Sequence, residues 1–150
     1  MKKINMGRIL IAGISSSIVF LIIEFFFEGA VKLIFDFTEV DLAKQYFANI
    51  VVTGTRYEIV NILYLLCTCT ITIWLYVCLC PKFGEGSKTA LIASFFVILV
   101  IVLFTVNHVN MGIFPLKPAL ISFIFSLIEF PVSIIAGAQL ISTKEYVRKN

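Results

Sequence analysis

Charged residues are scarce in this chain of 150 amino acids. Lys, Arg, Asp and Glu together make up 14% of the sequence, against roughly a quarter of an average soluble protein. Hydrophobic residues make up 60% of the chain, and its mean hydropathy is +1.03. A chain of this composition is not expected to fold as a water-soluble domain, so its apolar runs are candidate membrane spans.

Patterns that indicate catalysis or nucleotide binding are also missing. Histidine occurs once, and the sequence contains no serine–histidine–acid order, no paired aspartates and no multi-histidine set. Gly86-Ser87-Lys88-Thr89 echoes a phosphate-binding loop, but a serine separates the glycine from the lysine and the first glycine of that motif is absent. We therefore expect no nucleotide, no other cofactor and, on balance, no enzyme activity. The net charge of +3 gives no indication of nucleic-acid binding.

Cysteine is confined to one short stretch, residues 67–80. Cys67 and Cys78 would lie about 16 Å apart along a helix, so they cannot share a metal ion. Cysteines two positions apart point to different faces, and no disulfide pattern is indicated. The simplest interpretation is that they are small, helix-filling residues. Lipidation of Cys78 or Cys80 is the alternative.

Four apolar runs are long enough to span a membrane, which takes about 20 apolar residues in a helix. They lie at about residues 9–31, 59–80, 89–107 and 119–141. Because they use up almost the whole chain, they predict one all-α domain over residues 1–150, an antiparallel bundle of four transmembrane helices. The first run follows a basic stretch, as in a signal peptide, but no small-residue cleavage site comes after it. We expect this span to be retained.

The polar stretch between the first two runs predicts a short helix on the outer membrane surface. Thr38, with Asp41 three residues later, is a variant of the capping box. Val40, Ala43 and Phe47 would then share one face of a helix at residues 39–49, which suits an interfacial position.

The distribution of basic residues predicts the orientation. With the N-terminus in the cytoplasm, eight of the twelve fall inside: Lys2, Lys3, Arg8, Lys82, Lys88, Lys144, Arg148 and Lys149. Four fall outside or at the outer border: Lys32, Lys44, Arg56 and Lys117. An excess of basic residues near helix ends favours the cytoplasmic side, so we expect both termini there.

Two stretches carry a family resemblance: WLYVCLCPKFGEGSKTALIA and MGIFPLKPALISFIFSLIEFPVSIIAGAQL. A W-L-Y element before P-[KR]-F-G-x-G-x-K-T-A, and a later G-x-F-P before a helix containing Glu, resemble a family of small, uncharacterised bacterial inner-membrane proteins with four helices. INMGRILIAG and the region of Glu24 also fit, so the similarity covers most of the chain, whereas the cysteines are outside the pattern. The resemblance implies a bundle in the cell inner membrane and brings no activity with it.

Polar and small residues form a stripe on three of the runs, counting 3.6 residues per turn. The stripes are Gly13, Ser17 and Glu24 in the first run; Asn61, Tyr64, Thr68 and Thr72 in the second; and Ser122, Ser126, Glu129, Ser133 and Gly137 in the fourth. Membrane helices pack through such residues, so we expect the stripes to face inward. Glu24 is expected in the outer third of the bilayer and Glu129 about midway, beside Pro131. The phenylalanines are interpreted as lipid-facing bulk.

Ionisable groups inside a membrane are costly unless they are paired, solvated or neutralised, and are functional candidates by default. Glu24 and Glu129 are the leading candidates to bind an ion or proton, with His108 and Asn61 as helpers. Weaker candidates are Glu28, Asn107 and Asn110. A buried carboxyl group can carry a proton near neutral pH. Carboxylates with an imidazole can hold a divalent ion, whose identity stays open.

Simpler interpretations stand beside these. Glu28 and Lys32, four residues apart, can pair on the helix surface. His108 can be a loop or interface histidine. Glu24 and Glu129, if protonated, can be hydrogen-bonding groups that only fix helix packing.

Two functional hypotheses follow from the sequence. The first is an outward-facing polar cavity that binds or passes a small solute, a proton or a cation. The second is a non-catalytic accessory or assembly subunit, whose polar stripes dock another membrane protein or form a homo-oligomer. Both place the chain in a lipid bilayer.

Overall fold

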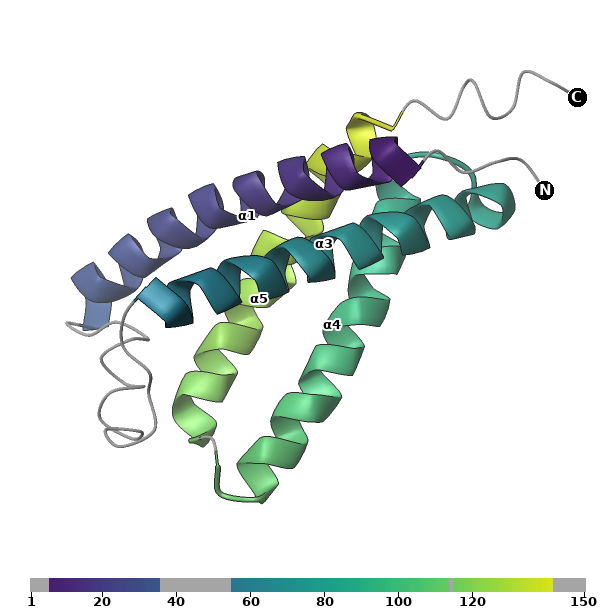
Figure 1. Cartoon of the computed structure of the whole chain (residues 1–150). Helices are drawn as coiled ribbons and strands as arrows, with labels where there is room; N and C mark the ends of the chain where they lie inside the picture. The colour runs from purple at the N-terminus through teal and green to yellow at the C-terminus, as the bar shows by residue number, and fades with distance from the viewer. Residues whose placement is uncertain (1–5, 36–54, 114, 142–150) are drawn as a thin grey trace, which may run out of the picture.

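The computed structural model describes residues 6–35, 55–113 and 115–141. Within these ranges the chain forms four α-helices: α1 (Met6–Phe35), α3 (Thr55–Phe83), α4 (Ser87–Asn110) and α5 (Leu116–Gln139) (Figure 1). Each contains a segment long and apolar enough to cross a membrane: Met6–Leu33, Glu58–Phe83, Ser87–Asn110 and Ala119–Gln139. The prediction of an all-helical chain with four such helices is confirmed. The short helix predicted at residues 39–49 lies outside the described residues.

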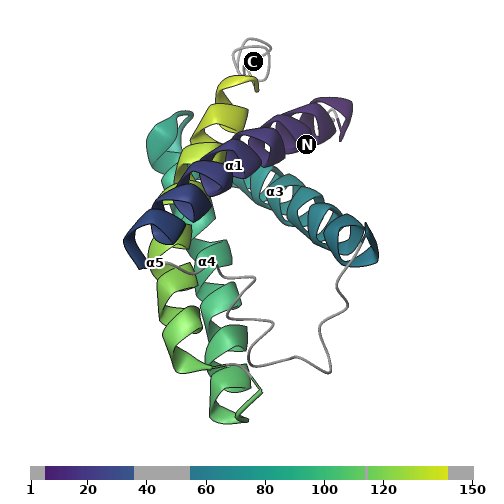
Figure 2. The ribbon, with the colours of Figure 1, turned by 90° about the vertical axis from the view of Figure 1, so that its left-hand side faces the viewer.

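The four helices form two pairs that cross each other. α4 and α5 run antiparallel side by side, and α1 and α3 lie across them (Figures 1 and 2). Both α1 and α4 pack against α3 and α5. The start of α1, the turn between α3 and α4, and the end of α5 lie at the same end of the molecule (Figures 1 and 2). We call this the closed end, because most of the buried core lies in the adjoining halves of the helices.

Small residues let α1 approach both of its neighbours. At Gly13, an added Cβ would stand 2.8 Å from the Cα atom of Thr70 in α3. At Gly137 of α5, it would collide with the Ser16 hydroxyl oxygen and stand 2.7 Å from the carbonyl oxygen of Ala12. Close backbone approach through small residues is the usual way for membrane helices to gain packing energy. α1 is therefore held between α3 and α5 at the closed end.

The turn between α3 and α4 is fixed by hydrogen bonds. Gly84 has a φ of 81°, and its N–H donates to the carbonyl oxygen of Cys80 over 2.9 Å, which ends α3 in the left-handed manner that favours glycine. The Thr89 hydroxyl donates to the Gly84 carbonyl over 2.6 Å. The Gly86 N–H donates to the hydroxyl of Tyr76, a buried residue of α3, over 3.3 Å. This turn joins the two helices at the closed end.

Candidate functional site

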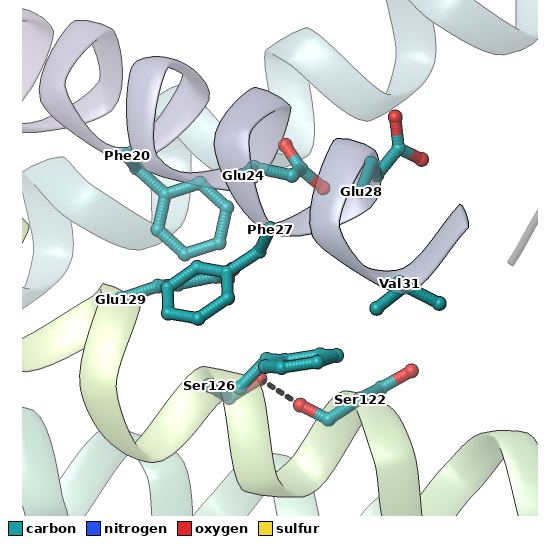
Figure 3. Close-up of a pocket in the computed structure, with 9 residues that line it drawn as sticks. Phe20, Glu24, Phe27, Glu28, Val31, Ser122, Ser126 and Glu129 are labelled. Atoms are coloured by element: carbon teal, nitrogen blue, oxygen red, sulfur yellow. Dashed lines mark hydrogen bonds between the residues drawn. The ribbon is translucent and has the colours of Figure 1, made fainter. Parts of the chain in front are cut away.

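A cavity of about 90 Å³ lies between α1 and α5 (Figure 3). The described residues that line it come from these two helices: Phe20, Glu24, Phe27, Glu28 and Val31 from α1, and Ser122, Phe125, Ser126 and Glu129 from α5. The structure thus brings together the two leading sequence candidates, Glu24 and Glu129, with the weaker candidate Glu28. No Lys or Arg is among the described residues that line the cavity.

The three carboxyl groups differ in burial. Glu129 is 5% exposed, Glu24 is half-buried and Glu28 is exposed. In Figure 3 the Glu129 side chain extends into the space between the helices, whereas the Glu28 carboxylate points away from α5. Glu129 is therefore the innermost acidic group of the site, and Glu28 lies at its rim.

Two serine hydroxyls of α5 donate hydrogen bonds to carbonyl oxygens of the same helix. The hydroxyl of Ser126 donates to the carbonyl oxygen of Ser122 over 2.7 Å, and Ser133 donates to Phe130 over 2.7 Å. Pro131 lies inside α5 and has no N–H, so the helical hydrogen bond to the carbonyl of residue 127 is missing. α5 bends near its middle in both views (Figures 1 and 2), as a proline inside a helix causes.

Aromatic rings form much of the remaining wall. The rings of Phe27 and Phe125 face each other across the two helices with centroids 4.9 Å apart. Phe20 packs edge-on against Phe130, with centroids 6.4 Å apart. The interpretation of all phenylalanines as lipid-facing bulk is therefore wrong for these residues. The spacing could have indicated it, since Phe20, Glu24 and Phe27 share one helical face.

The other sequence candidates do not line this cavity. His108 is exposed near the end of α4, with its Nδ1 2.7 Å from the carbonyl oxygen of Phe104. Asn107 lies nearby, its amide nitrogen 3.9 Å from the Met111 sulfur, and Asn110 is also exposed. Asn61 is exposed on α3. The structure therefore places neither of the two proposed helpers, His108 and Asn61, in the cavity that Glu24 and Glu129 line.

The inward orientation of the stripes holds for α1 and α5 but only in part for α3. Gly13, Ser17, Ser133 and Gly137 are buried. On α3 only Thr72 is buried, and Tyr64 is 61% exposed. The physical reason is the crossing of the helices, which packs α3 against its neighbours mainly in its second half.

A metal centre is not formed by the described side chains. No three His, Cys, Asp or Glu residues within residues 6–35, 55–113 and 115–141 lie close enough to hold a metal ion. The predicted combination of carboxylates with an imidazole is not assembled, because His108 stands apart from the cavity.

Comparison with models of protein families, with curated proteins and with solved structures found no match for this chain. The family resemblance stays a prediction from the sequence.

Proposed function

We propose that this chain is a multi-pass protein of the bacterial inner membrane that binds or passes a proton or a small cation in the cavity between α1 and α5. The observation that carries the proposal is that Glu129, 5% exposed, lines one cavity together with Glu24. Glu129 would be the main charge-bearing group, with Glu24 opposite it and Glu28 at the rim.

The position of Glu129 along its helix supports this role. It is the central residue of the apolar segment Ala119–Gln139, so it lies near the middle of the bilayer when that segment crosses it. A carboxylate at that depth is costly unless it is paired, solvated or neutralised, and uptake of a proton neutralises it. A group that only fixed helix packing would need no cavity beside it, and this favours binding over packing.

The size of the cavity narrows the choice of ligand. A space of about 90 Å³ holds a few water molecules. Pockets for drug-sized ligands are about 300–1,000 Å³. Of the small solute, proton and cation named by the first hypothesis, we therefore favour the proton and the small cation.

The closed end is proposed to face the cytoplasm, with both termini on that side. Arg8, Lys82 and Lys88 lie at this end, in the first turns of α1 and around the turn between α3 and α4, whereas Lys32 and Lys117 lie at the opposite ends of their helices. The excess of basic residues on one side supports this orientation.

The experiment that tests the proposed function is labelling with a hydrophobic carbodiimide. The reagent adds to protonated carboxyl groups in apolar surroundings, and ionised carboxylates do not react. We expect the full chain in lipid vesicles to be labelled at Glu129, with labelling falling as the pH rises and absent from Glu129→Gln. Glu28, exposed in the same protein, is the internal control. Equal labelling of Glu28 and Glu129 would overturn the proposal. No labelling of Glu129 at any pH would exclude the proton as the ligand and leave only a cation held by an ionised carboxylate.

One observation favours the accessory-subunit hypothesis as a second candidate. Asn61 and Tyr64 are exposed on the membrane-length segment of α3, and a polar side chain that faces lipid gains from a partner helix. Cross-linking of the purified protein in vesicles tests it. Cross-linked dimers that form in the unmodified protein but not in Asn61→Leu would favour docking through α3. A monomer at all lipid-to-protein ratios would exclude a homo-oligomer.

A further inference from the structure

We propose that Glu129 exchanges its proton with one side of the membrane only, the side opposite the closed end. The chain then responds to the pH of that side and does not conduct protons. This proposal rests on the proposed function and deepens it, because it takes the proton as the ligand and selects binding over passage. Two features carry it: the cavity extends toward one end of α1 and α5, and the contact between the same helices is closely packed toward the other end.

The cavity extends from Glu129 away from the closed end. In Figure 3, Phe20 and Glu129 lie at one end of the lining and Glu28 lies at the other. Glu129 is 5% exposed, Glu24 is half-buried and Glu28 is exposed, so exposure increases in that direction. Glu28 lies only about 7.5 Å along the helix from Leu33, the last residue of the apolar segment of α1. The cavity therefore connects Glu129 with the membrane border that is farther from the closed end.

Polar groups in the lining make this part of the contact a route for protons. A proton reaches a buried carboxyl group through water or through a chain of polar side chains. A space of about 90 Å³ holds a few water molecules when polar groups are there to bind them. Glu24, Glu28, Ser122 and Ser126 supply carboxyl and hydroxyl groups along the lining.

Toward the closed end, side chains fill the space between α1 and α5. Phe20 packs edge-on against Phe130, the residue after Glu129, with ring centroids 6.4 Å apart. Beyond these rings, Ser16 lies directly against Gly137. About 15 Å of α5 separates Glu129 from the end of its apolar segment on this side. The ring contact and the serine–glycine contact close the interface of α1 with α5 there.

The hydroxyl groups on the closed side are not arranged as a proton path. Ser133 donates to the carbonyl oxygen of Phe130 over 2.7 Å, and Ser17 donates to that of Gly13 over 2.9 Å. Each of these bonds stays within one helix. The Ser16 hydroxyl oxygen is buried and has no hydrogen-bond partner among the described residues. A proton on Glu129 therefore has no hydrogen-bonded chain to the closed end within the part of the molecule that the structure describes.

The titratable groups that face the cavity beside Glu129 both come from α1, and they are Glu24 and Glu28. The other helices packed against α5, α3 and α4, contribute none of the described lining residues. On α4 the ionisable side chains, Lys88 and His108, stand near its two ends. Between the ends of its apolar segment, α3 carries only tyrosines and cysteines as ionisable residues. The carboxyl groups of the cavity thus dominate its response to pH.

The test is carbodiimide labelling of Glu129 under a pH gradient. The full chain is studied in right-side-out and inside-out membrane vesicles, and impermeant buffers hold the lumen and the medium at different pH. We expect labelling to follow one side of the protein, which is the medium in one kind of vesicle and the lumen in the other. Where Glu129 is mostly ionised, each further unit of pH on that side lowers the protonated fraction and the labelling rate about tenfold. A protonophore, which equalises the pH, is the control and is expected to abolish the difference.

Reaction with a membrane-impermeant maleimide assigns the side. In a variant without native cysteines, Glu85→Cys in the turn between α3 and α4 marks the side of the closed end. We expect the labelling of Glu129 in the unmodified chain to follow the pH of the opposite side. We also expect purified chain in lipid vesicles, under a potassium diffusion potential, to pass protons no faster than vesicles without protein.

The outcomes separate one-sided exchange from the proposed function. Labelling that follows the pH of both sides or of the closed-end side, or a proton flux above that of protein-free vesicles, would overturn one-sided exchange. Proton binding at Glu129 would stand in each of those cases. No labelling of Glu129 at any pH would overturn one-sided exchange and would also exclude the proton as the ligand. The gradient and flux measurements use the unmodified protein, so they do not depend on the folding of a variant.

Discussion

Gly137 of α5 lies directly against Ser16 of α1, so closely that a Cβ atom at position 137 would collide with the serine hydroxyl oxygen. Two turns earlier on α5, the same pair of helices encloses the cavity beside Glu129. Along this contact between α1 and α5, the residues change from glycine and serine to phenylalanine. This change explains why the two helices touch at one end and enclose a cavity farther along. Small side chains bring the backbones together at the closed end, and the rings of Phe20 and Phe27 hold them apart beyond it.

Gly137→Ala is expected to destabilise the protein. The added methyl group meets the Ser16 side chain and the carbonyl oxygen of Ala12 at 2.7 Å, and overpacking of this kind costs about 1–3 kcal/mol. Unfolding in mixed micelles, followed by circular dichroism, measures the loss. Gly29→Ala in α1 is the matched control, because no atom lies within 4 Å of its added Cβ. Equal stability of the two variants would contradict the close contact of α1 with α5.

Ser16→Ala and Ser17→Ala are expected to have opposite effects on stability. Both serines are buried. The Ser16 hydroxyl has no hydrogen-bond partner among the described residues, and removing an unsatisfied buried group stabilises a protein by about 1 kcal/mol. The Ser17 hydroxyl donates to the Gly13 carbonyl oxygen over 2.9 Å, and its loss costs about 0.5–1.5 kcal/mol. The same unfolding assay checks the signs, and a loss of stability in Ser16→Ala would show that its hydroxyl has found a partner.

His108→Ala and Asn61→Ala are expected to leave the carbodiimide labelling of Glu129 unchanged. Neither side chain lines the cavity, and both are exposed. Labelling rates of the two variants at several pH values check this against the unmodified chain. A shift in the pH dependence of either variant would place that residue within reach of the carboxyl pair, as the sequence alone had predicted.

The proposed orientation predicts which turns are accessible from outside the cell. In a variant without native cysteines, Gly112→Cys is expected to react with a membrane-impermeant maleimide in intact cells, because it follows the end of α4. Glu85→Cys, in the turn between α3 and α4, is expected to react only after the membrane is opened. The reverse pattern would invert the topology, and reaction of both sites in intact cells would show that α4 does not cross the membrane.

The sequence predicted the helices well because each depends on one local property. A run of about 20 apolar residues needs no knowledge of its neighbours to be recognised as a helix of membrane-spanning length. The stripes on α1 and α5 were also predictable, since Gly13, Ser17, Ser133 and Gly137 repeat at helical spacing. Glu24 and Glu129 were each expected on an inward-facing stripe, and the structure places both in the lining of one cavity.

The remaining features depend on how the helices cross, which helical periodicity does not determine. Asn61 and Tyr64 have the spacing of an inward stripe, yet they are exposed because α3 packs mainly through its second half. His108 was predicted as a helper of the glutamates, but it lies near the end of α4 and does not line the cavity. The aromatic lining of the cavity was not predicted, because the sequence does not distinguish a phenylalanine that faces lipid from one that lines a cavity.

Reversible proton uptake by Glu129 is the central claim, and infrared difference spectroscopy tests it most directly. Spectra of the full chain in lipid are compared at acid and alkaline pH. We predict a carbonyl stretching band of a protonated carboxylic acid that disappears at alkaline pH, is absent from Glu129→Gln and is retained in Glu28→Gln. A band that survives unchanged in Glu129→Gln, or the absence of any such band from the unmodified protein, would contradict the account.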